Sequence, residues 1–174
     1  MNRSAIQPMP EYFDRYINKT EDSDHLAVLE TGLREMEQFP LDAFRALGTK
    51  VYAPGKWTVK EILQHVIDSE RIFADRALSF ARKEPGTVLS YDENDYAAVS
   101  DAEKRTLESL VDEMITVRRS TIALFRSFSD EMLLRSGKGF RGEYSVLSIA
   151  FILAGHPRWH MDIIRERYLP LLNH

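Results

Sequence analysis

The chain has 174 residues, of which 44% are hydrophobic and 29% are charged, and its formal net charge is −4. This length and composition predict one globular domain, residues 1–174, with a sizeable core. An acidic chain with no basic block is a poor ligand for phosphates, so we expect no nucleic-acid partner. The absence of cysteine excludes disulfides, thiolate metal sites and a cysteine nucleophile.

The hydropathy pattern predicts neither a signal peptide nor a membrane span. The stretch "MNRSAIQPMPEYFDRY" has no apolar region of the kind found in signal peptides. The longest uncharged stretch, 144–157, is shorter than the roughly 20 residues that a membrane span needs. We therefore expect a cytoplasmic protein without a membrane partner.

In chain order, helix signals come first and strands are not needed. We expect a helix over 23–39, ended by Pro40, and one or two further turns before Gly48. The stretch "TVKE" reads as a capping box that opens a long amphipathic helix over 58–83, and "EPG" ends it.

After a polar and aromatic linker, "TVLSYDENDYAAV", the sequence again has a capping signal followed by a long helix. "SDAE" at 100–103 reads as another capping box. The helix expected after it carries residues at three- and four-residue steps, namely Leu107, Leu110, Met114, Val117, Thr121, Leu124 and Phe128. A glycine-rich break, "SGKGFRGEYS", follows.

The last long helix is expected from about Ser145 to about Tyr168, and it contains Pro157. Proline inside a helix removes one amide donor and can clash with a carbonyl, so we expect this helix to be kinked near Pro157. Its predicted inward positions are Val146, Ile149, Leu153, His156, His160, Ile163 and Arg167. Four long helices predict an all-α fold, a four-helix bundle.

Three of the five histidines are candidate metal ligands. His156 and His160 are four residues apart, so both imidazoles can face one ion. His65 lies in the middle of the second long helix, and from a facing helix it would supply a third ligand and leave one position open. The alternatives are a chance HxxxH pair and a hydrogen-bonded core histidine at His65. His25, near the start of a helix, is expected to be partly exposed, and the terminal His174 is set aside.

A zinc protease of the HExxH type is excluded by the residue after the first histidine. That motif needs a glutamate there as the general base, and this chain has Pro157.

Taken together in this order, four stretches resemble the DinB-like superfamily of metal-binding four-helix bundles, which includes the bacillithiol S-transferases. The stretches are "KWTVKEILQHVIDSERIFADRALSFAR", "YDENDYAA", "SLVDEMITVRRSTIALFRSF" and "GEYSVLSIAFILAGHPRWHMDIIRERYL". The resemblance implies that His65, His156 and His160 bind a divalent metal ion, with zinc or nickel expected. The family often has a pattern close to "GHExHH", from which this chain departs at Pro157 and Trp159.

The resemblance and the open site lead us to expect an enzyme that transfers a low-molecular-weight thiol, as cosubstrate, to a small electrophilic molecule. One alternative is a metal-dependent hydrolase that uses a metal-bound hydroxide. Asp68 or Glu70 could then act in proton transfer, although we expect both to be surface charges. The other alternative is a helical binding module without catalysis, and in either case a homodimer could form through apolar helix faces.

Two residue pairs have a simpler interpretation. We expect Arg118 and Arg119 to be solvated or paired with helix neighbours such as Glu113, although they could contact an anion. Trp57 and Trp159 are expected to be packing residues.

Overall fold

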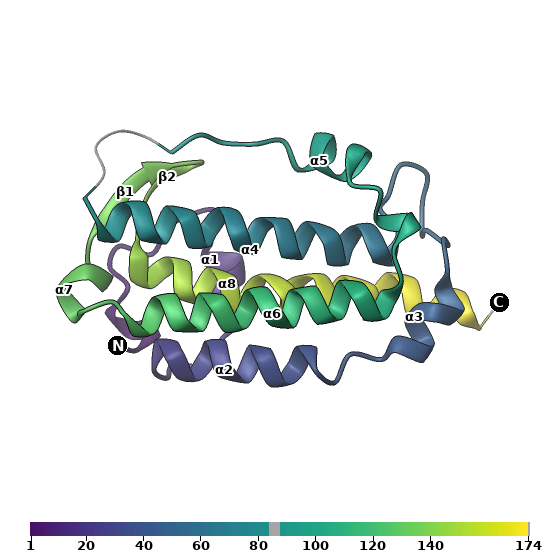
Figure 1. Ribbon diagram of the computed structural model, residues 1–174, viewed down its shortest axis with the longest axis horizontal. Helices are drawn as coiled ribbons and strands as arrows, with labels where there is room; N and C mark the ends of the chain where they lie inside the picture. The colour runs from purple at the N-terminus through teal and green to yellow at the C-terminus, as the bar shows by residue number, and fades with distance from the viewer. Residues whose placement is uncertain (84–87, 174) are drawn as a thin grey trace.

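A computed structural model describes residues 1–83 and 88–173 of the chain. Its four long helices are α2 (His25–Met36), α4 (Val59–Ala81), α6 (Leu107–Arg126) and α8 (Val146–Ile163). Contacts join α2 to α6, α6 to α4, α4 to α8 and α8 to α2, so the helices form a bundle with α2 and α4 at opposite corners (Figure 1). The predicted all-α four-helix bundle is confirmed.

One long crossover sets the topology of the bundle. His65 of α4 lies against His156 of α8, while Phe80 of α4 lies against Tyr144, two residues before α8, so these two helices are antiparallel. Helices α4 and α6 run in the same direction, since Gln64 bonds to Arg105 just before α6 while Glu70 pairs with Arg118 farther along it. The connection that returns the chain between them includes the described residues 88–106. Part of this connection folds as α5 (Glu93–Val99) and the 3-10 turn η2 (Ala102–Lys104), which the sequence pattern had not indicated.

Only one of the two predicted capping boxes exists. At α4, Thr58 accepts from the amide of Glu61, and the Glu61 side chain accepts from the amide of Thr58, as predicted. At residues 100–103 the prediction is wrong. Asp101 has a φ of 53°, which breaks the helical path, and α6 begins only after Thr106, whose side chain accepts from the amide of Ser109 at 3.1 Å.

Shorter elements pack around the bundle. The helices are α1 (Asp14–Ile17), α3 (Leu41–Leu47) and α7 (Asp130–Leu133), and the 3-10 turns are η1 (Arg3–Ala5) and η4 (Leu169–Leu172). The glycine-rich break contains an antiparallel hairpin of β1 (Ser136–Gly139) and β2 (Gly142–Ser145), so the expectation of no strands was wrong. Positive φ angles at Arg141 and Gly142 make its tight turn, and buried Tyr144 packs against Phe80.

Helix α8 is continuous through Pro157, and a kink in its axis at this residue stays a prediction. Its first departure from α-helical geometry is the π-helical turn η3 (Ile164–Tyr168). The carbonyl of Leu153 loses its intrahelical donor to the proline ring, and Nη2 of Arg118 donates to this carbonyl at 2.7 Å instead. A side chain of α6 thus replaces the missing backbone amide.

Because of the π-helical turn, the buried face of the last helix differs from the predicted inward face. Val146, Ile149 and His156 are buried as expected, but Arg167 is exposed. Ile164 and Tyr168 are buried in its place. A π-helical turn holds an extra residue, so the buried face moves along the sequence.

The centre of the bundle contains an ion pair between Arg118, which is 0% exposed, and Glu70, which is 2% exposed. Arg118 donates to both oxygens of this carboxylate, at 2.7 and 2.9 Å. The expectations of a surface role for Glu70 and of a solvated Arg118 are therefore wrong. Arg119 is exposed and pairs with Glu37.

Two expectations fall outside the described residues, namely the stop signal at 84–86 and His174. Within the described part of the chain, no helix is long and apolar enough to cross a membrane.

Candidate metal centre

The side chains of His65 from α4 and of His156 and His160 from α8 converge on one point. Nε2 of His156 lies 3.2 Å from Nε2 of His65 and 3.0 Å from Nε2 of His160. One ring nitrogen from each of the three lies within 4.8 Å of the others. Two nitrogens that bind one tetrahedral zinc at their usual bond length are about 3.3 Å apart. The spacing is thus close to that which a single ion requires.

Local packing places the two histidines of α8 next to α1. Gly155 precedes His156, and a Cβ at this position would lie 1.9 Å from the backbone oxygen of Tyr16. Only glycine therefore allows α1 to approach α8 so closely. The ring of Tyr16 then packs edge-on against His156, with 5.0 Å between their centroids.

Burial keeps the three imidazoles neutral. It lowers the pKa of His65 to about 4 and that of His160 to about 3. For His156, burial first and the two neighbouring imidazoles second hold the pKa well below its usual value. Neutral imidazoles present the lone pairs that a metal ion needs, so the site is prepared for metal binding at neutral pH.

The metal-free protein is expected to lose stability as the pH falls from about 6.5, the usual histidine pKa, towards 4. In this range the unfolded chain binds protons at His65 and His160, while the folded chain does not until about pH 4 and 3. Each histidine adds a slope of up to about 1.4 kcal/mol per pH unit to the free energy of unfolding. Urea titrations between pH 4 and 7 with a chelator would measure it. The variant His160→Gln should have a shallower slope, and an equal slope would contradict the burial of His160.

A cavity of about 140 Å³ opens beside the histidines. Seven aromatic residues line it, namely Tyr12, Phe13, Tyr16, Trp57, Phe73, Tyr91 and Phe140. The Trp57 ring lies 4.8 Å from that of His65, so this residue forms part of the site, beyond the packing role that we expected. Trp159 packs on Tyr16, with 5.8 Å between their rings.

The two carboxylates that we considered for proton transfer do not line this cavity. Glu70 is held by Arg118, and Asp68 accepts from Nε2 of Gln64 at 2.9 Å. Glu93, which lies in α5 and is exposed, is the one carboxylate among the described residues that line the cavity. The sequence pattern missed it because the crossover had no predicted structure.

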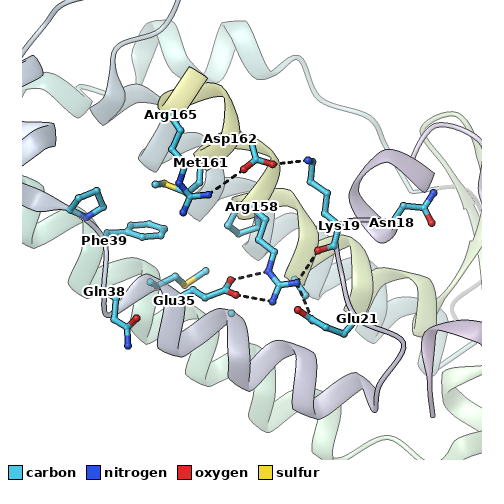
Figure 2. A pocket seen from close by; sticks show the side chains of 15 residues that line it. Asn18, Lys19, Glu21, Glu35, Gln38, Phe39, Arg158, Met161, Asp162 and Arg165 are labelled. Atoms are coloured by element: carbon cyan, nitrogen blue, oxygen red, sulfur yellow. Dashed lines mark hydrogen bonds and ion pairs between the residues drawn. The ribbon is translucent and has the colours of Figure 1, made fainter. Parts of the chain in front are cut away.

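A second and larger cavity, of about 620 Å³, lies next to α2 and α8, and no histidine is among its described lining residues. Figure 2 shows Arg158 at its centre, where it donates to both oxygens of Glu35, at 2.9 and 2.8 Å, and to the carbonyl of Lys19 at 2.9 Å. The side chain of Lys19 pairs with Asp162 at 2.6 Å. These contacts fasten the segment before α2 to the turn of α8 that carries His156.

The comparison with protein families decides which family this bundle represents. Residues 18–164 match the model of the DinB superfamily. The chain belongs to the DinB superfamily. In a comparison with curated proteins, none matched the chain.

One solved structure is similar to this DinB-superfamily chain over most of its length. It is YfiT from Bacillus subtilis, described as a probable metal-dependent hydrolase with an unusual four-helix bundle topology. The sequences are 18% identical, the TM-score is 0.67, and the similarity covers 91% of this chain and 86% of YfiT. This similarity confirms the fold.

Proposed function

We propose that the chain is a metal-dependent enzyme that holds one divalent ion on His65, His156 and His160 and acts on a small molecule in the adjacent aromatic cavity. The supporting observation is the convergence of three neutral imidazoles, those of buried His156 and of half-buried His65 and His160, from two helices at the wall of a cavity. Burying three imidazoles without partners would be unfavourable, and a shared ion would satisfy all three. A set of three nitrogen ligands fits zinc or nickel.

A bound divalent ion would supply Lewis-acid chemistry, which lowers the pKa of a thiol or water that binds to it. The protein's part is to orient the three ring nitrogens and to exclude water. Trp57 and Tyr16, which pack against His65 and His156, shield the site and would hold the apolar part of a substrate.

For the reaction itself we propose transfer of a low-molecular-weight thiol to an electrophile. Among the described residues no carboxylate forms a hydrogen bond with the three histidines, and a thiol needs less help from a protein base than water does. Hydrolysis is the second candidate. Two observations favour it: Glu93 lines the cavity and could act as a base, and YfiT is described as a probable metal-dependent hydrolase.

The expected result is that zinc- or nickel-loaded protein accelerates thiol addition to an electrophile panel, and that His65→Ala abolishes the acceleration. Conjugate formation would be followed by chromatography, beside ester and amide hydrolysis without thiol. The variant Glu93→Gln serves as the control, because it removes the one candidate base among the described cavity residues without touching the histidines.

Thiol transfer that survives Glu93→Gln would support the first candidate. Thiol-independent ester or amide turnover that falls by about a hundredfold or more in Glu93→Gln would support hydrolysis instead. A metal-loaded protein that does neither would contradict an enzymatic role and favour the binding module.

A further inference from the structure

The two fully buried arginines among the described residues have different surroundings. Arg118 is 0% exposed and is neutralised by Glu70. Arg76 is 3% exposed, and no carboxylate of the described residues forms an ion pair with it. A buried charge without a counterion is costly, so natural proteins pair such groups or use them for binding.

The guanidinium of Arg76 is only partly engaged within the protein. Its Nη2 donates to the carbonyl of Leu89 at 2.8 Å, and its Nη1 donates to the hydroxyl of Tyr144 at 3.4 Å. These bonds use two of the five N–H donors that an arginine carries. The same side chain packs over the ring of Phe73, with 4.8 Å between Cζ and the ring centroid. Among the residues that the structure describes, neutral partners thus orient the guanidinium and no carboxylate compensates its charge.

Arg76 belongs to the same cavity as the histidines. His65, Ser69, Phe73 and Arg76 follow each other at three- and four-residue steps, so they share one face of α4, and all four line this cavity. Eleven residues of helix separate the Cα atoms of His65 and Arg76 by about 16 Å, part of which the long arginine side chain covers. The cavity therefore has a cationic end and a histidine end.

Glu93, the one carboxylate among the described cavity residues, is not the counterion of Arg76. It is exposed, and no ion pair joins it to Arg76. The wall between the two ends is aromatic and includes Phe73 and Tyr91, whose hydroxyl is hydrogen bonded to Ser69 at 2.7 Å.

We propose that Arg76 is a carboxylate-binding residue of the histidine cavity, and that the substrate or cosubstrate is a small carboxylic acid whose apolar body lies along the aromatic wall. The planar guanidinium fork suits the two oxygens of a carboxylate. The inference deepens the proposed function, since it takes the histidine cavity as the substrate site, but binding of the acid by Arg76 does not depend on catalysis.

The test is a calorimetric titration with 3-phenylpropionate and with 3-phenylpropionamide, which has nearly the same shape and no charge. Both titrations are made on metal-free and on zinc-loaded protein, because a carboxylate could also bind the ion. The acid is expected to bind about ten- to a hundredfold more tightly than the amide in both forms. Equal affinities, or binding of the acid only when zinc is present, would overturn the proposal.

Variants then assign the effect to Arg76. Arg76→Met should reduce the affinity for the acid to that for the amide and leave the amide unchanged, and Arg76→Lys should lie between them. Arg34→Met is the control that removes the same charge elsewhere. Arg34 is exposed and, among the described residues, bonds only to Thr31, so this variant should bind the acid as the wild type does. Equal losses in Arg76→Met and Arg34→Met would mean a general charge effect and would overturn the proposal.

Two further observations keep the test decisive. If Arg76→Met does not fold, the Nε–H resonance of Arg76 in the wild type should shift on addition of the acid and not of the amide, and no shift would overturn the proposal. A protein that holds no metal but still prefers the acid through Arg76 would contradict the proposed function and support this inference.

Discussion

Replacing Arg118 by methionine is expected to lower the free energy of unfolding by about 3–5 kcal/mol. The variant leaves the carboxylate of Glu70, which is 2% exposed, without its partner. It also leaves the carbonyl of Leu153 without a donor. Urea denaturation followed by circular dichroism would measure the loss. Arg119→Met, next to it on the exposed side of α6, should change stability by less than about 0.5 kcal/mol.

A double-mutant cycle with Pro157→Ala tests whether Arg118 truly replaces the missing amide. An alanine at position 157 has an N–H that can donate to Leu153. Arg118→Met should therefore cost about 1 kcal/mol less in the Pro157→Ala background than in the wild type. Equal costs in the two backgrounds would mean that Arg118 acts through Glu70 alone.

Gly155→Ala is expected to destabilise the protein by about 1–3 kcal/mol and to weaken zinc binding. The new methyl group would lie 1.9 Å from the oxygen and 2.6 Å from the carbonyl carbon of Tyr16, so α1 must move away from α8. That movement disturbs the contact between the ring of Tyr16 and His156. Urea denaturation and zinc competition with a chromophoric chelator would measure both effects.

A loop glycine provides the control for this variant. Gly48 has a φ of 55° and no neighbouring atom within 4 Å of its missing Cβ. Gly48→Ala should therefore strain the backbone and destabilise the protein, but it should leave zinc affinity unchanged. If Gly155→Ala binds zinc as tightly as Gly48→Ala does, the close approach of α1 does not position His156.

The sequence predicted those parts of the molecule that depend on local periodicity. The bundle and the Thr58 cap follow from patterns within one segment. The meeting of His65 with His156 and His160 was a possibility on spacing and was implied by the family resemblance, and the structure brings their ring nitrogens within 4.8 Å. Ligation of a metal by these residues stays a prediction, as do the homodimer and the cytoplasmic location.

The features that escaped sequence reasoning depend on contacts between segments. Arg118 and Arg119 are adjacent and chemically identical, yet Arg118 is buried and paired with Glu70 whereas Arg119 is exposed. Two similar capping boxes differ because Asp101 adopts a positive φ angle. Glu93 enters the cavity only through the path of the crossover, which local periodicity does not encode.

The central claim is that residues from two helices, α4 and α8, share one metal ion. Its most direct test is the metal content of untagged protein, measured by mass spectrometry for the wild type, His65→Ala and His160→Ala. The control is His25→Ala. His25 is buried against the N-terminal amine, so the expectation that it is partly exposed was wrong, and it lies outside the cluster. We expect near-stoichiometric zinc or nickel in the wild type and in His25→Ala, and loss of the metal in the other two variants. A wild type that stays metal-free after incubation with zinc and nickel would contradict the account.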